Sequence, residues 1–399
     1  PSTQSMYTYS YLPGTDLLSG YTAGDFTRTV SYEPYRSLIT SVENKHNSTT
    51  ISRYDYENDA LGRRPAISRS GTAFGDMPVR DSYGYNHRSE VTSARRTLAS
   101  NPSQEIRGFS YDYEYDPIGN CITSTEYDHN NNPLVSAYTA NELNQYEQRT
   151  IPGYATVRGS ATNTATVTVN GNSTWLLDDY VYGGDNADNS TTAIMKELQI
   201  IAAHSNHYSA VTGHVFIAQT PEQFQYDDDG NLTQDGRWQY IWNGENRLIK
   251  AETRDDLPES VPRVTVEYAY DHQGRMVWKQ ITTPDTPPNT INYTWDDYNI
   301  IAEVECRESG VTTTYNLWGL DLSGTIQGAG GIGGLLAVYS PLTVGEGQSE
   351  GGTALPCYDA NGNITEYLST NSTIAAYYEY SPFGEIVIQS GDLAPTFTH

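Results

Sequence analysis

The sequence predicts an all-β protein: a curled ribbon of antiparallel β-hairpins, a partial shell or barrel, with an inserted small β-sandwich. Three observations predict this fold class. A short tyrosine-and-turn unit recurs along the 399 residues, the 33 tyrosines far outnumber the 7 phenylalanines and 6 tryptophans, and 34 glycines with 19 prolines supply frequent turns. A tyrosine ring can be buried while its hydroxyl still reaches a polar partner, so tyrosine suits the faces of a sheet.

The recurring unit is an aromatic-x-Tyr pair, then Asp or Asn, then a few residues that end in Gly-Asn or Gly-Arg. The pair places both rings on one face of a strand, because side chains alternate with a period of two. Asp or Asn opens a turn with its own side chain, and glycine supplies the positive φ that closes it. Each unit therefore predicts a β-hairpin. The structural repeat motif comprises Tyr54, Tyr56, Gly62, Tyr113, Tyr115, Gly119, Tyr226, Asp227, Gly230, Tyr268, Tyr270, Gly274, Tyr358, Asp359 and Gly362.

The repeat divides the chain into three predicted domains. Residues 1–150 and 222–399 carry the unit, so we expect both to form hairpin ribbon. Residues 151–221 lack it and contain short strand-like segments, which predict an Ig-like β-sandwich that projects from the ribbon. Within this insert, residues 193–203 allow a helix by propensity, but the neighbouring strands favour a strand. Residues 341–356 are rich in Gly, Ser and Glu and predict an exposed mobile loop.

Charge and composition exclude several classes of partner. The 49 acidic residues exceed the 23 basic ones by 26, which argues against binding to nucleic acid or to an anionic membrane surface. There is no apolar run of about 18 residues, so we expect no membrane insertion. The acidic, Asn-, Thr- and Tyr-rich composition favours a secreted or cell-surface location. Cys121, Cys306 and Cys357 lack metal-type spacing; they suit small buried hydrophobes, and one disulfide with a free thiol stays open.

Three patterns invite a chemical interpretation, and each has a structural alternative that we prefer. Asp227–Asn231 resembles part of a calcium loop but lacks its later ligands. His204, His207 and His214 lack the glutamate and helix of a zinc site. The glycine-rich run 328–334 has no Lys-Ser/Thr after it. We therefore predict no catalytic residue, no cofactor and no metal site.

The repeat units resemble those of the RHS/YD-repeat family, which includes bacterial RHS polymorphic toxins, the shell components of insecticidal toxin complexes, and the teneurins. Several longer phrases carry the resemblance beyond the short unit, and the last two resemble the approach to the family's core region. These phrases are Tyr138–Tyr146, Gly230–Gly236, Tyr240–Leu248, Tyr315–Asp321 and Tyr380–Glu385.

The resemblance implies a structural function. We expect a wall segment of a secreted or surface-displayed shell, from a bacterial source, that encapsulates or presents another element. Its partners would be the remainder of a larger parent chain or its cargo. The aspartates of the family's self-cleavage motif have no counterpart after the Tyr380–Glu385 phrase, so neither that activity nor a toxin activity is carried over. An extracellular module that binds glycan or a cell-surface protein stays open as the alternative, and an enzyme of unrecognised type as the third.

Overall fold

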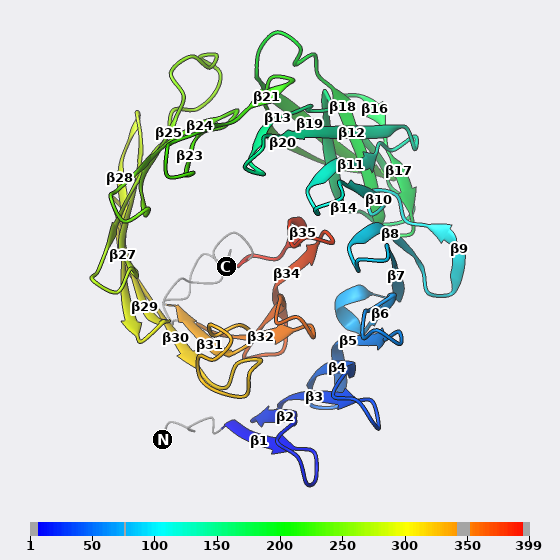
Figure 1. The fold of residues 1–399 in the computed structure, drawn as a ribbon. Helices are drawn as coiled ribbons and strands as arrows, with labels where there is room; N and C mark the ends of the chain where they lie inside the picture. Colours follow the sequence, from blue (N-terminus) through cyan, green and yellow to red (C-terminus); the bar gives the residue numbers. More distant parts are fainter. Residues whose placement is uncertain (1–6, 76, 341–351, 394–399) are drawn as a thin grey trace.

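The computed structural model describes residues 7–75, 77–340 and 352–393. Within them the fold is all-β, as predicted, with antiparallel sheets and one short 3-10 turn, η1 (Thr72–Phe74). Figure 1 shows that the ribbon curls into an open ring, and that its last strands lie inside its first ones. In the described part of the chain, no helix is long and apolar enough to cross a membrane.

The first 14-stranded sheet is a meander in which each strand pairs mainly with its neighbours in the chain. The exceptions are β9, which pairs with β8 beside the main path, and β21, which joins the end of the sheet beside β13. The strands are β1 (Tyr7–Tyr11), β2 (Leu18–Ala23), β3 (Phe26–Tyr32), β4 (Ile39–His46), β5 (Thr49–Glu57), β6 (Ala66–Ser70), β7 (Val79–Tyr85), β8 (Val91–Leu98), β9 (Asn101–Glu105), β10 (Tyr111–Tyr115), β11 (Cys121–Tyr127), β12 (Pro133–Ala140), β13 (Tyr146–Arg149) and β21 (Glu222–Gln223).

The second 14-stranded sheet is an uninterrupted meander from β22 to β35. Its first nine strands form a single layer on the left of Figure 1, and its last strands turn into the ring. The strands are β22 (Gln225–Tyr226), β23 (Leu232–Gln234), β24 (Trp238–Trp242), β25 (Leu248–Thr253), β26 (Thr265–Tyr270), β27 (Met276–Thr283), β28 (Thr286–Asp296), β29 (Asn299–Arg307), β30 (Gly310–Trp318), β31 (Leu335–Ser340), β32 (Gly352–Tyr358), β33 (Ile364–Ser369), β34 (Ile374–Tyr380) and β35 (Ile386–Ser390).

The strands between these sheets pair only among themselves within the described residues, in one sheet of three strands and one of four. Side chains from both sheets share a core that contains Ala155, Val169, Leu198 and Ile217. The segment that allowed a helix or a strand is strand β19. The bounds are β14 (Tyr154–Ser160), β15 (Thr166–Val169), β16 (Asn172–Ser173), β17 (Trp175–Leu177), β18 (Tyr180–Asn186), β19 (Ile194–His204) and β20 (His207–Ile217). The Ig-like domain over 151–221 stays a prediction.

The expectation that this insert projects from the ribbon is wrong for its three-stranded sheet. The Tyr182 hydroxyl donates to the Tyr127 carbonyl at 2.5 Å. Arg158 Nε donates to the Gly108 carbonyl at 2.7 Å. The sheet docks on the ribbon because its tyrosine and arginine side chains donate hydrogen bonds to backbone carbonyls there. The pattern of residues in the sequence does not show that these groups meet.

The expectation of a mobile loop over 341–356 is also wrong in part. Residues 341–351 lie outside the described residues, but 352–356 belong to strand β32, which pairs with β31 and β33. Ala354 and Cys357 of this strand are buried. The apolar residues that follow the glycines provide enough burial to hold a strand despite the glycine-rich context.

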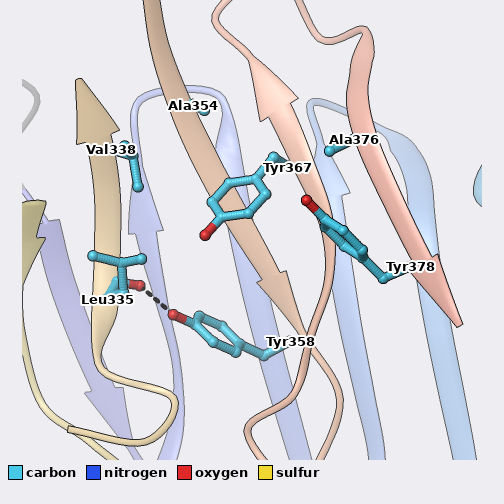
Figure 2. Packing of buried hydrophobic residues seen from close by; sticks show 7 residues of the cluster. All are labelled: Leu335, Val338, Ala354, Tyr358, Tyr367, Ala376 and Tyr378. Carbon is cyan, nitrogen blue, oxygen red and sulfur yellow. Dashed lines mark hydrogen bonds between the residues drawn. The ribbon is translucent and has the colours of Figure 1, made fainter. Parts of the chain in front are cut away.

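The last strands also share an apolar core. Figure 2 shows how side chains from four neighbouring strands interlock there, and the Tyr358 hydroxyl donates to the Leu335 carbonyl at 2.7 Å. The buried Tyr358 hydroxyl therefore has a hydrogen-bond partner. The cluster comprises Leu335, Val338, Ala354, Tyr358, Tyr367, Ala376 and Tyr378.

Candidate functional site: the seam between two turns of the ribbon

The turn of the repeat unit has one geometry along the ribbon. In the turn that begins at Asp227, carboxylate Oδ1 accepts the backbone N–H groups of Asp229 and Asn231 at 3.1 and 2.8 Å. Gly230 closes the turn with a φ of +86°. The carboxylate is thus engaged with the backbone of its own turn. The other predicted turn glycines also have positive φ: Gly62, Gly119, Gly274 and Gly362. Asp359 and Asp271 accept the corresponding N–H groups.

Two turns of this kind lack the glycine that the sequence motif requires. Asn141 and Asn243 accept backbone N–H groups as the aspartates do. Asn144 and Asn246 take the positive φ that glycine has elsewhere. Asparagine is the non-glycine residue that best tolerates this conformation, so a motif that allowed it would have found both turns.

In several units the second aromatic residue ties its hairpin to an earlier one. Tyr115 donates its hydroxyl to the Val91 carbonyl at 2.8 Å, and Tyr270 to the Leu248 carbonyl at 2.7 Å. The strand register shifts immediately before both tyrosines, and such bulges turn a side chain toward a new partner. Tyr226 reaches the Tyr146 carbonyl at 3.0 Å, so the link spans the whole insert.

Tryptophans take the same position in three units that the sequence motif missed. Trp242, Trp295 and Trp318 donate their indole N–H groups to the carbonyls of Leu232, Met276 and Ile300 at 2.8, 2.9 and 2.7 Å. Each also follows a register shift. A motif that required an N–H or O–H donor on an aromatic ring, rather than tyrosine alone, would have included them.

The remaining predicted motif tyrosines lie in three different environments. Tyr54 and Tyr56 are buried, and both contact the C-terminal strands. Tyr113 packs edge-on against Phe383 with ring centroids 4.8 Å apart. Tyr268 is half-buried in β26, in the part of the ribbon that has one layer. The repeat thus places tyrosines at equivalent positions but does not set their burial.

Burial is greatest where β1–β8 lie outside β31–β35, a region that we call the seam (Figure 1). Hydrogen bonds cross it at several points. The Tyr7 hydroxyl donates to the Leu336 carbonyl at 2.8 Å, and the Asn44 amide to the Tyr358 carbonyl at 3.1 Å. The Ala360 N–H donates to the Tyr56 hydroxyl at 2.9 Å. Residues about 300 apart in sequence therefore form one double-layered wall.

A buried ion network joins the two layers at β8 and β34. Arg96 Nε lies 2.7 Å from Asp81 of its own layer, and its Nη1 contacts Glu379 of the inner layer. Arg69 also pairs with Asp81, at 2.7 Å. Although burial opposes its ionisation, Arg69 and Arg96 hold the pKa of Asp81 below its usual value. The exposed fraction of Arg96 is only 1%, so the network is cut off from solvent.

A second buried carboxyl crosses the seam without a cation in ion-pair distance in the described structure. Glu366 accepts hydrogen bonds from Ser52 at 2.7 Å and from Tyr54 at 3.3 Å, both on β5, and from its neighbour Thr365 at 3.0 Å. Burial raises its pKa to about 7, although these hydrogen bonds and the charge of Arg69 oppose the rise. The Cys357 thiol lies beside it, and burial raises the pKa of that thiol well above its usual value.

The other residues that the sequence singled out do not come together in one place. His204 and His207 are paired across the β19–β20 hairpin, and His214 faces Glu197 at 3.4 Å. Among the described residues, no three His, Cys, Asp or Glu side chains cluster as metal ligands. Residues 328–334 wrap around Asp321, whose carboxylate accepts the Ala329 N–H at 2.6 Å. Cys121, Cys306 and Cys357 are all unpaired.

The comparisons with known proteins give distant matches. No family model matches the chain. Over 165 residues it is 25% identical to the tRNA3(Ser)-specific nuclease WapA of Bacillus spizizenii, a match that covers 41% of this chain and 6% of that protein. Among solved structures, it is similar to TcdB2-TccC3-Cdc42, with 13% identity and a TM-score of 0.39, over 95% of this chain and 18% of that one.

A second solved structure, TcdB2-TccC3 without its hypervariable C-terminal region, matches in the same way. Its sequence identity is 12% and its TM-score 0.37, over 94% of this chain and 18% of that one. The chain therefore spans less than a fifth of the length of each of these three relatives.

Proposed function

We propose that the chain is a wall segment of a secreted or surface-displayed RHS/YD-repeat shell, which encloses or presents another element and catalyses no reaction. The seam is the observation that carries this proposal. It joins the two layers through side chains such as Arg96, Glu366 and Glu379, which are at most 2% exposed. A ribbon that overlaps itself in this way encloses space, whereas a flat binding surface needs no second layer.

The partner in this proposal is the rest of a longer chain or its cargo. The net charge of −26 suits a wall that stays soluble while it holds that partner. Several buried donors and acceptors at the seam are paired across the layers, so that opening the wall would leave groups such as Glu379 and Arg96 buried without their partners. The seam is therefore the place where the wall is easiest to disable by a single substitution.

Protease protection tests the proposal. The chain is expressed together with the flanking coding sequence of its gene and digested with a nonspecific protease. We expect the flanking segment to survive in the wild-type protein and to be degraded in the Arg96→Met variant. The matched control, Arg307→Met, changes an exposed arginine of the single layer and should keep the protection. Equal degradation in all three proteins would contradict the proposal.

A second candidate function, glycan binding, is favoured by a polar cleft between the ribbon and the insert. The cleft has a volume of about 690 Å³ and is lined by Asn130 and Asn132 of a ribbon turn and by Asn172 and Asn186 of the insert. Trp175 lies among these amides. Amide groups around an aromatic ring suit a neutral oligosaccharide, whose hydroxyls need partners and whose C–H faces need an apolar surface.

A glycan array tests this second function. Binding of a neutral oligosaccharide by the wild-type chain, its loss in Asn186→Ala, and its retention in the exposed control Gln239→Ala would support it. An empty array would contradict it and leave the wall proposal unaffected, since the seam is not part of the cleft.

A further inference from the structure

The insert occupies the place of a hairpin turn. Strands β13 and β21, which flank it, pair directly, with Arg149 opposite Glu222. These two side chains also form an ion pair. The hydroxyl of Tyr226 reaches the carbonyl of Tyr146, as in hairpins that a short turn closes. The ribbon is therefore continuous across the insert, so the continuity of the ribbon does not explain why the insert is there.

The insert lies against the strand that ends the inner layer. Strand β35 is the last strand of the second sheet, and among the described strands it pairs only with β34. Its sequence, Ile-Val-Ile-Gln-Ser, has no charge and no proline, which are the usual devices that protect such a strand. Strand β14 of the insert contacts β35 without sharing a sheet with it (Figure 1). This last strand is thus held from the side of the insert.

One apolar core joins three parts of the molecule near this contact. Its buried centre contains Val79 and Leu98 of the outer layer. Side chains from the insert and from β35 pack against this centre. They are Trp175, Leu177 and Tyr180 of the insert and Val387 and Ile388 of β35. Because the three parts share this burial, removing one of them exposes apolar surface of the other two.

Tyr180 of the insert also extends the cover of the buried ion network. The Arg96 guanidinium lies over the ring of Phe109, 4.0 Å from its centroid. The Tyr180 ring packs edge-on against Phe109, with ring centroids 5.7 Å apart. Burial raises the pKa of Tyr180, and the charge of Glu379 raises it further, so its hydroxyl lies within the field of the network. The insert therefore helps to exclude water from Arg96 and Glu379.

We propose that the insert is a strap: its three-stranded sheet holds the last strands of the inner layer, β34 and β35, against the outer layer, and its displacement opens the seam from that end. Tyr182 and Arg158 fix the strap to the ribbon, and Tyr180 provides its contact with the seam. This inference rests on the proposed wall function and names the part of the chain that keeps the wall closed.

The contact between the strap and the inner layer is incompletely packed. A cavity of about 400 Å³ lies between them, and its lining includes Gly159 of β14, Tyr377 of β34 and Ile388 of β35. A Cβ at Gly159 would meet nothing within 4 Å. Side chains that border a void lack dispersion contacts on that side. The strap therefore separates from β35 at a lower cost than close-packed layers would.

The first test compares amide hydrogen exchange in β35 with exchange in β27, which lies where the ribbon has one layer. Tyr180→Ser should accelerate exchange in β35 by about tenfold or more and leave β27 unchanged. The matched control, Tyr208→Ser, removes a tyrosine of the same insert that is 80% exposed on β20, and should change neither strand. Unchanged exchange in β35, or equal acceleration in β27, would overturn the inference.

A deletion variant tests the strap as a whole. Residues 150–221 are replaced by Asn-Gly, a two-residue turn that closes a hairpin between directly paired residues such as Arg149 and Glu222. We expect exchange in β35 to accelerate at least as much as in Tyr180→Ser, with β27 again unchanged. Wild-type exchange in β35 of the deletion variant would show that the last strands need no strap.

A variant with the opposite effect keeps the inference falsifiable if the other two fail to fold. Gly159→Val places a side chain in the cavity and should slow exchange in β35 by about threefold or more. The matched control is Gly213→Val on β20, where a Cβ also meets nothing within 4 Å. It should leave β35 unchanged. Equal slowing by both variants would assign the effect to strand propensity and overturn the inference.

Protease protection of the flanking segment separates this inference from the proposed function. If that segment is protected in the wild type while Tyr180→Ser and Gly159→Val leave exchange in β35 unchanged, the wall proposal stands and the strap does not. If exchange in β35 responds as expected while the wild type gives no protection, the strap stands and the wall proposal does not.

Discussion

The seam and the single-layer arc, strands β22–β30, are built from the same hairpin unit and differ in what covers them. Tyr270 of the arc and Tyr358 of the seam each follow a register shift and donate a hydroxyl to a carbonyl of an earlier hairpin. Tyr358 is 1% exposed, whereas Tyr270 is half-buried. The repeat therefore encodes the hairpin and its link to the next one, and the second layer adds burial.

The charges of the two regions differ in the same way. In the arc, Arg307 and Glu305 pair at 2.7 Å with side chains that are 56 and 20% exposed. In the seam, the side chains of Arg96 and Glu379 are both 2% exposed. Water screens the first pair and is excluded from the second, so matched substitutions in the two regions measure what the second layer contributes.

The largest difference is expected for the arginines. Arg96→Met should lower the free energy of unfolding by about 3–5 kcal/mol, because it leaves Glu379 and Asp81 buried with less compensation. Arg307→Met should change it by about 1 kcal/mol or less. Urea unfolding followed by tryptophan fluorescence measures both. Equal effects would mean that solvent reaches the seam.

The stability of the seam should depend on pH through the ionisation of Glu366. Its pKa is raised from 4.5 to about 7 by burial, so its contribution to stability is full below about pH 4.5 and is lost as the pH rises through 7. The shift corresponds to about 3 kcal/mol. Amide exchange, corrected for its intrinsic pH dependence, should accelerate in β33 relative to β27 over this range. Glu366→Gln should remove the difference, and a persistent difference in that variant would assign it to another group.

The cost of replacing a turn glycine by alanine should depend on what surrounds that glycine. A Cβ at Gly274 of the arc meets nothing within 4 Å, so Gly274→Ala should cost only the strain of a positive φ, about 1 kcal/mol. A Cβ at Gly362 of the seam would lie 2.6 Å from Ile332, so Gly362→Ala should cost about 2–3 kcal/mol. Thermal unfolding compares them, and equal shifts in Tm would contradict the packing of the 328–334 segment on that turn.

The smallest difference in stability is expected when the tyrosine hydroxyls that bond to an earlier hairpin are removed. Tyr358→Phe leaves the Leu335 carbonyl without its buried donor and should cost about 1–2 kcal/mol. Tyr270→Phe frees a carbonyl that water can reach, and should cost about 0.5 kcal/mol. Urea midpoints of the two variants provide the comparison. A larger loss for Tyr270→Phe would show that the links matter more where there is one layer.

Local features of this fold could be predicted from sequence, because they depend on neighbouring residues. Asp227 and Gly230 specify a turn by their own chemistry, and strand β19 follows from the strands around it. The motif was too narrow at Trp242, where a tryptophan replaces the donor tyrosine, and at Asn246, where an asparagine takes the positive φ of the turn glycine.

The seam could not be predicted in the same way, because it depends on how strongly the ribbon curls. Arg96 and Glu379 are 283 residues apart, and the repeat motif specifies neither of them. Their meeting is set by the summed twist and bulges of many hairpins. The docked position of the insert has the same origin, since Arg158 reaches the Gly108 carbonyl only after both segments are folded.

A double-mutant cycle between Arg96 and Glu379 tests the central claim, that the ribbon closes over itself. The free energy of unfolding is measured for Arg96→Met, Glu379→Gln, the double variant and the wild type. The account predicts a coupling energy of about 2 kcal/mol or more, because the two side chains meet out of contact with water. Effects that add within about 0.5 kcal/mol would show that the two layers are not in contact, and would contradict the account.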